Sequence, residues 1–326
     1  MNRPIDRRSF VGGAAFGPAL LAAVSQAADE PRPNPPEDRA REVRLERLRP
    51  KQIDEAMAAC PTLFVPLGTI EWHGLHNIVG LDAVKAHLLC IEAARRSGGL
   101  VAPPLYGGVG GLDEPHTFVM EPENDVFSVL LRAWVEKLCR EAVRQGFRAL
   151  IVLTGHYGAA QQIVVRELAA RMTRALAVPV LGTPEYLLAL DAGYLGDHAA
   201  WGETSLMMYL DPAGVDLAAL GEAPHRGVGG RDPKKFASRA DGEKLAETII
   251  GRLASLARQM PTWDAAAIRR FADAEAALVN RQITLAAEQK TVWAGWRHLG
   301  QGVLNDYARL LLEGRFDQIA DLAEKL

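Results

Sequence analysis

The chain has 326 residues, of which 48% are hydrophobic and 24% charged, and its formal net charge at pH 7 is −3. This composition is that of an ordinary globular protein with one large domain and a sizeable core. The near-neutral charge gives no electrostatic reason to expect binding to nucleic acid or to an anionic membrane surface. Cys60, Cys90 and Cys139 lie far apart in apolar surroundings, so we expect buried thiols rather than a disulfide framework or a zinc knuckle.

The N-terminal residues are typical of an export signal. The pair Arg7-Arg8 precedes a short apolar run from Val11 to Val24. A basic start, a short apolar stretch and small residues favour a secretory signal, because a membrane span needs about 20 apolar residues. The Arg-Arg-Ser-Phe sequence resembles the twin-arginine signal, which a receptor reads as an address. We therefore predict a signal peptide over 1–28, a proline-rich linker over 29–47, and a periplasmic or secreted mature protein without a membrane anchor. An uncleaved amphipathic tail is the alternative.

Short apolar runs alternate with amphipathic stretches between residues 48 and 262. Runs this apolar fit strands that are covered on both faces, as in a parallel sheet. Their alternation with helical patterns predicts an α/β layer fold with a mostly parallel sheet. The expected strands are 62–67, 99–105, 149–153 and 178–181, and the expected helices are 83–96, 126–145, 160–175 and 242–259.

The pattern changes after Pro261. From Ala265 to the C-terminus only helical periods remain, and they are broken near Gly300 and Gly314. We predict a helical C-terminal extension over residues 263–326, which is a candidate for packing against a neighbouring subunit.

Reactive side chains follow the first predicted strand. Open α/β sheets place their ligand sites at strand ends. Glu71 and His73 are two residues apart, which puts both side chains on one face of an extended chain. Asp82 follows at the start of the next helix, and this mixture of carboxylates and imidazole suits a borderline divalent metal. In the alternative, Asp82 only caps the helix and the other two are solvated loop residues.

Two further segments carry candidate site residues. His156 directly follows the third predicted strand, where a side chain faces the ligand crevice, although a structural histidine is the alternative. His198 and Glu203 lie in a glycine-containing turn before an apolar helix. Glu203 would also suit the first turn of that helix without any ligand, because the helix dipole favours a carboxylate there. A site requires these segments to converge.

Together the segments resemble the creatininase family of creatinine amidohydrolases, over roughly residues 48–260. The family's first motif is Glu-x-His-Gly-Pro-His, followed by a glycine-containing turn and Asp. Its second motif is Asn-Gly-His, and its third is His-Ala-Gly-x-x-Glu-Thr-Ser. The matching residues are Glu71, His73, His76 and Asp82 for the first motif, Thr154-Gly155-His156 for the second, and residues 198–205 for the third.

The resemblance implies a three-layer α/β/α sandwich that binds two divalent metal ions per chain, Zn or Mn with Fe as a further candidate. By similarity, Glu71 and His156 ligate one metal, His73 ligates the other and Asp82 bridges them. A metal-activated water would be the nucleophile. His198 matches the position that handles protons near the leaving nitrogen, as suits an imidazole. Relatives assemble into hexamers, so we expect a homo-oligomer.

The sequence also departs from the family. Creatininase has a Glu two residues after the second-motif His, and here Gly158 has no side chain that can ligate. Glu203 therefore becomes the candidate substitute ligand, and with His198 a candidate catalytic residue. Leu75 replaces the usual Pro, and the loop 113–118 lacks the family's Pro-Gly-Thr, which puts creatinine in doubt as the substrate.

The resulting prediction is a metal-dependent amidohydrolase that cleaves a non-peptide C–N bond of a small molecule. A cyclic amide, a lactam or a formamide would fit. The alternatives are a catalytically inactive metal- or small-molecule-binding member of the same fold, and a short-peptide hydrolase. Candidates for lining the pocket are Trp72, Tyr157, Tyr194 and Trp201.

Overall fold

The computed structural model describes residues 41–326 except Asn124. The predicted signal peptide and the first part of the predicted linker lie outside the described residues. At the end of that linker, Val43 is fully buried, and its carbonyl accepts a hydrogen bond from the Val101 N–H at 2.9 Å. The compact unit therefore includes the chain from Arg41 onward. Along this part of the chain, no helix combines the length and apolarity that a bilayer crossing requires.

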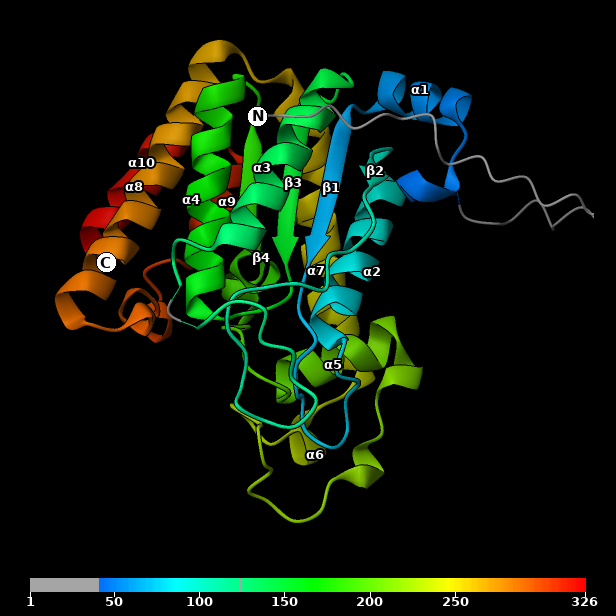
Figure 1. Ribbon diagram of the computed structural model, residues 1–326, viewed down its shortest axis with the longest axis vertical. Coiled ribbons are helices and arrows are strands. Elements are labelled where there is room, and N and C mark those ends of the chain that lie inside the picture. Colours follow the sequence, from blue (N-terminus) through cyan, green and yellow to red (C-terminus); the bar gives the residue numbers. More distant parts are fainter. Residues whose placement is uncertain (1–40, 124) are drawn as a thin grey trace, which may run out of the picture. The chain divides into compact units, whose positions relative to one another are not determined.

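Helices and strands alternate through the first half of the described chain, up to Pro184, and helices alone follow (Figure 1). The strands are β1 (Thr62–Leu67), β2 (Leu100–Val101), β3 (Ala149–Thr154) and β4 (Val180–Pro184). The α-helices are α1 (Pro50–Ala59), α2 (Leu81–Ser97), α3 (Val129–Arg144), α4 (Ala159–Leu176), α5 (Trp201–Leu210), α6 (Pro233–Phe236), α7 (Arg239–Gln259), α8 (Ala265–Gln289), α9 (Tyr307–Leu312) and α10 (Phe316–Lys325). Short 3-10 helices include η3 (Glu185–Leu188), η8 (Val292–Trp296) and η9 (Leu299–Gln301).

The four strands form one parallel sheet in the order β2-β1-β3-β4. Every residue of these strands is buried, which explains why the strands are apolar throughout instead of alternating. Phe64 and Ile151 point to a core shared with α2 and α7, whereas Val65 and Val152 point to a core shared with α3 and α4. The predicted three-layer α/β/α sandwich is confirmed.

The second strand is much shorter than predicted. The sequence indicated a strand over 99–105, but only Leu100 and Val101 pair with β1. Pro103 and Pro104 follow at once, and proline lacks the N–H that a sheet ladder needs. The chain returns to β1 only at Leu105, through an isolated bridge.

The C-terminal helices continue the fold of the same chain. α8 packs along α4, and α10 packs on the outer side of α8 (Figure 1). Arg166 of α4 is fully buried, and its Nη2 lies 3.0 Å from Glu275 Oε2 of α8. The hydroxyl of Tyr307 donates to the other oxygen of Glu275 at 2.9 Å. A buried ion pair whose carboxylate has both oxygens engaged therefore joins the extension to the helix layer on the sheet.

We expect Arg166→Met to destabilise the protein by about 3–5 kcal/mol, because it leaves the Glu275 carboxylate buried without a cation. The measurement is urea denaturation with a chelator present. Arg174→Met is the matched control, since Arg174 joins the same two helices through Asp273 but the two side chains are 53% and 70% exposed. Its loss should stay below about 1 kcal/mol. Similar losses for both variants would contradict a structural role of the buried pair.

Candidate metal centre

The predicted ligand residues converge at the carboxyl end of the sheet. They come from the loop after β1, the first turn of α2, the loop after β3 and the first turn of α5. None of their side chains is appreciably exposed, since every one of these residues is at most 4% accessible. The residues are Glu71, His73, Asp82, His156 and Glu203.

Two glycines allow the start of α2 to touch two strand ends. A Cβ on Gly68, directly after β1, would lie 2.1 Å from the backbone nitrogen of Ala83. A Cβ on Gly155, directly after β3, would lie 2.1 Å from the carbonyl oxygen of Asp82. Only glycine permits such backbone contacts. This close approach places the Asp82 side chain between the two loops that carry the histidines.

Two of the candidate ligand groups share Asp82, and a third combines Glu71, His73 and His198. In the first group, His156 Nδ1 lies 3.0 Å from Glu71 Oε2 and 3.2 Å from Asp82 Oδ2. In the second, His73 Nε2 lies 3.1 Å from Asp82 Oδ1 and 3.7 Å from Glu203 Oε2. Within each group the candidate ligand atoms all lie within 4.8 Å of one another. Because each oxygen of Asp82 faces a different group, its carboxylate has the geometry of a bridge.

Several of these buried atoms lack a hydrogen bond. Among the described residues, Glu71 Oε2, His73 Nε2 and Asp82 Oδ2 have no hydrogen-bond partner. Buried polar atoms are normally satisfied, and leaving them unsatisfied costs free energy. Imidazole nitrogens and carboxylate oxygens that converge without partners are the donor set that Zn²⁺ or Mn²⁺ takes. The residues present therefore fit divalent metal ions.

The second nitrogen of each imidazole is held by a backbone carbonyl. His73 Nδ1 lies 3.0 Å from the carbonyl of Glu71, and His156 Nε2 lies 3.1 Å from the carbonyl of Val109. A carbonyl accepts the N–H of one nitrogen, so the other nitrogen is the one that can bind a metal once it loses its proton. The ring orientations are thus set before any ligand enters.

The site balances its charges internally. Burial alone would lower the pKa of His73, but the carboxylates of Asp82, Glu203 and Glu71 raise it to about 9. In the same way His156 has a raised pKa despite burial, and the imidazoles lower the pKa of Asp82 and Glu71. Without metal, protons on the histidines neutralise the carboxylates. A divalent ion replaces those protons, so metal binding and deprotonation are coupled.

A buried lysine that the sequence analysis did not single out holds Glu203. Lys85 is fully buried on α2, and its ammonium donates to Glu203 Oε1 at 2.5 Å and to the Tyr157 hydroxyl at 2.8 Å. It also pairs with Glu185 Oε1 at 2.8 Å. With Oε1 engaged, Glu203 turns Oε2 toward His73. A lysine three residues after Asp82 shares its helix face, and this spacing was the available signal.

His198 lies beside the same centre. Its ring stacks on that of His73 with centroids 4.4 Å apart, and its Nε2 lies 2.8 Å from the carbonyl oxygen of Trp72.

His76, the remaining histidine of the first motif, does not belong to the candidate ligand groups. Its Nε2 contacts Thr204 Oγ1 at 3.0 Å, and burial lowers its pKa to about 4. The neutral imidazole of His76 therefore joins the first and third motifs.

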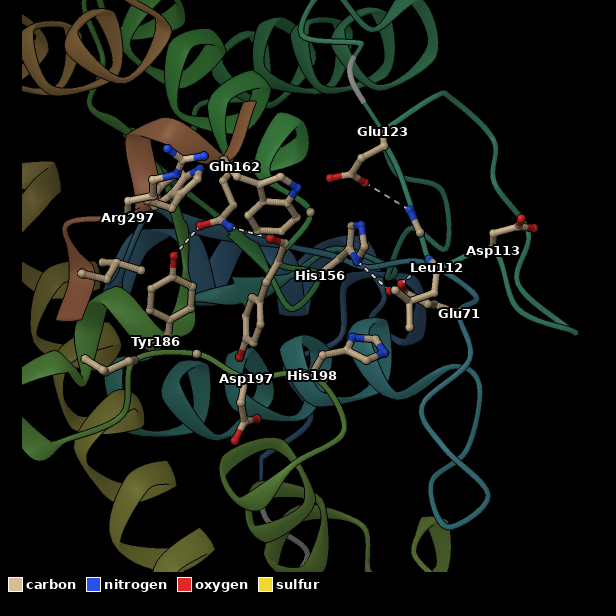
Figure 2. Close-up of a pocket in the computed structure, with 18 residues that line it drawn as sticks. Glu71, Leu112, Asp113, Glu123, His156, Gln162, Tyr186, Asp197, His198 and Arg297 are labelled. Atoms are coloured by element: carbon tan, nitrogen blue, oxygen red, sulfur yellow. Dashed lines mark hydrogen bonds and ion pairs between the residues drawn. The ribbon is translucent and has the colours of Figure 1, made fainter. Parts of the chain in front are cut away.

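A cavity of about 620 Å³ opens onto the centre. Glu71, His156 and His198 lie on its wall, and Figure 2 shows them with Glu123, which the sequence analysis missed. Of the four aromatic residues expected to line a pocket, only Tyr157 does so. The others are engaged elsewhere: Trp72 with the carbonyl of Arg226, Tyr194 with the Tyr157 hydroxyl in the core, and Trp201 with Asp241.

The cavity also has a wall that was not expected. It is built by the C-terminal segment, which contributes Trp293, Trp296, Arg297 and Leu299. These residues lie 90 or more positions after Glu203 in the sequence. No motif or spacing connects them to the centre.

Comparison with known proteins places this geometry in a family. The family model described as creatinine amidohydrolase matches residues 46–257. The chain belongs to the creatininase family. The expected resemblance is thereby confirmed, and at this level the chain is a metal-dependent amidohydrolase that acts on C–N bonds.

Individual creatininase relatives are similar over most of their own length. The creatinine amidohydrolase of Pseudomonas putida is 28% identical over 236 residues, which cover 60% of this chain and 88% of that protein. The solved structure named creatininase Mn is 26% identical with a TM-score of 0.56, over 68% of this chain and all of that one. A putative creatinine amidohydrolase from Bacteroides fragilis has the same TM-score at 24% identity, covering 68% and 98% of the two chains.

Gly158 lies where creatininase has a glutamate, and the structure leaves no room for that residue. A Cβ on Gly158 would lie 2.6 Å from His156 Nε2 and 2.8 Å from the carbonyl oxygen of Val109. The hydrogen bond between these two atoms therefore occupies the space. Glu203 reaches the second group from a different segment, the first turn of α5.

We expect Lys85→Met to destabilise the metal-free protein by about 3–5 kcal/mol, because two buried carboxylates lose their common cation. Chemical denaturation in the presence of a chelator measures this loss. Lys244→Met on α7 is the control, since Lys244 is exposed and the change should stay within about 0.5 kcal/mol. A Lys85 variant as stable as the control would mean that Glu185 and Glu203 are not held as charged groups.

Proposed function

We propose that the chain is a two-metal amidohydrolase that cleaves a non-peptide C–N bond, in a cyclic amide, lactam or formamide. The observation that carries this proposal is the pair of three-ligand groups that share the Asp82 carboxylate. Metal-loaded protein is to be assayed against cyclic amides, formamides and short peptides. Hydrolysis confined to peptides would favour a peptidase, and one ion per chain without turnover would favour a binding protein.

Each residue of the centre has a defined part in this proposal. Glu71, Asp82 and His156 would hold one ion, and His73, Asp82 and Glu203 the other. Zn²⁺ and Mn²⁺ suit these ligands, with Fe²⁺ as a further candidate, and one relative is named as a manganese form. Bound divalent ions supply an activated water and polarise the scissile carbonyl.

His198 is the group that moves a proton. The carbonyl of Trp72 accepts from Nε2, so the neutral ring carries its hydrogen there and leaves Nδ1 as the proton acceptor. The ring lies on the cavity wall and against His73, beside the position of the reacting carbonyl. An imidazole there can take a proton and deliver it to the departing nitrogen.

Asp82→Ala should abolish metal-dependent hydrolysis, because one carboxylate serves both groups. Elemental analysis should show the metal content falling from about two ions per chain to nearly none. The exposed Asp273→Ala serves as the control and should retain both ions. Full activity in Asp82→Ala would rule out the shared-carboxylate arrangement.

Glu203→Gln should have a narrower effect. The amide keeps the size of the side chain but weakens its bond to a cation, so we expect one ion to be lost and the other, bound by Glu71 and His156, to remain. Glu243→Gln on the exposed face of α7 is the matched control. Unchanged metal content in Glu203→Gln would remove this residue from the ligand set.

A further inference from the structure

The C-terminal segment forms a fixed wall of the catalytic cavity although it lies beyond the part matched by the family. Trp293 and Trp296 belong to η8, and Arg297 and Leu299 follow it. Figure 2 shows Arg297 with Tyr186 and Gln162 at one side of the cavity, and Glu71 and Glu123 at the other. The cavity therefore extends from the candidate metal ligands to this segment.

The wall is anchored to the body of the protein. Ala294 and Gly295 are buried, and a Cβ on Gly295 would lie 2.8 Å from the Cβ of Gln282 on α8. Arg166 Nη1 contacts the Gln282 amide oxygen at 3.4 Å, so the ion pair that ties α8 to α4 extends to the residue beneath the wall. The segment thus keeps its place relative to the metal ligands.

Two polar groups of this wall have unused hydrogen-bonding capacity among the described residues, the buried indole N–H of Trp296 and the exposed guanidinium of Arg297. Trp296 is 6% exposed, and its Nε1 has no hydrogen-bond partner among the described residues. Arg297 contacts Gln289 Oε1 through Nη1 at 2.8 Å and forms no ion pair with a described carboxylate. A buried N–H without an acceptor costs free energy, which an incoming anionic oxygen would recover.

The charges around the cavity limit which anion fits. Arg297 is the one arginine or lysine of the cavity wall, within the part of the chain that the structure describes. Carboxylates also line the cavity, at Glu71, Asp113, Glu123 and Asp197. Their repulsion acts more strongly on a dianionic phosphate than on a singly charged carboxylate. The cavity volume of about 620 Å³ suits a ligand with a body between its two polar ends.

We propose that Trp296 and Arg297 form a carboxylate-binding subsite, so that the substrate is an amide or formamide with an apolar body and a carboxylate at its far end. Trp293 and Leu299 contact the apolar body. The proposal rests on the proposed amidohydrolase function and specifies its substrate class.

A matched pair of probes tests this proposal on the full chain. N-formyl-phenylalanine carries the carboxylate, and N-formyl-phenylalaninamide replaces it with a neutral carboxamide. Formate release from metal-loaded protein should give a kcat/KM at least about tenfold higher for the acid, as expected for one charge-assisted hydrogen-bonded contact. Arg297→Gln should reduce the ratio of the two kcat/KM values toward one, mainly by raising KM for the acid.

Calorimetric titration with a chelator present separates this proposal from the proposed function, because binding is then measured without turnover. The acid should bind about tenfold more tightly than the amide, and Arg297→Gln and Trp296→Phe should each reduce that difference. Arg309→Gln, an exposed arginine of α9 outside the cavity wall, should not. If neither probe is hydrolysed but the acid still binds selectively, only the amidase proposal fails. Equal binding of acid and amide to the unaltered protein would overturn the subsite.

Discussion

The position of the Asp82 carboxylate is the constraint on which the rest of the centre depends. Its two oxygens face two different imidazoles, at 3.1 Å and 3.2 Å, so it connects the group that contains His156 to the group that contains Glu203. That position requires the backbone of α2 to touch the ends of β1 and β3 at Gly68 and Gly155. Because β1 and β3 are neighbours in a parallel sheet, their carboxyl ends meet at one edge. The order of the strands and the two glycines thus determine where the Asp82 carboxylate lies.

The buried charges are then balanced within two connected sets of side chains. The first set contains the histidines and carboxylates that face the candidate metals. The second contains Lys85 and Glu185, which lie behind Glu203. A carboxylate shared between a fixed ammonium and a metal site cannot rotate freely, so its second oxygen is presented in one direction. Such preorganisation reduces the rearrangement that metal binding requires. The same contacts hold Glu203 in the position that the proposed second metal site requires, where Gly158 offers no ligand.

The sequence predicted the layers and the chemical centre because both depend on local patterns. Apolar runs without alternation indicated covered strands, and Glu71, His73, Asp82 and His156 follow strand ends, where a parallel sheet gathers its loops. Lys85 escaped prediction because a lysine in a helix is normally solvated, and only the tertiary structure shows its two carboxylate partners. The same applies to the cavity wall. Trp296 and Arg297 reach the centre through the packing of α8 on α4, which no sequence spacing encodes.

The candidate metal centre and the proposed substrate-selecting wall therefore belong to different parts of the chain. Residues 46–257, which match the family, contain every candidate metal ligand described above, whereas the wall opposite these residues belongs to the extension. The two parts are joined by the buried Arg166–Glu275 pair and by Gln282, which contacts both Arg166 and the backbone of η8. A substitution at Arg166, Glu275 or Gln282 would move the wall without changing any candidate metal ligand. The wall keeps its position relative to the centre through the buried ion pair, through Gln282 and through the packing of α8 on α4.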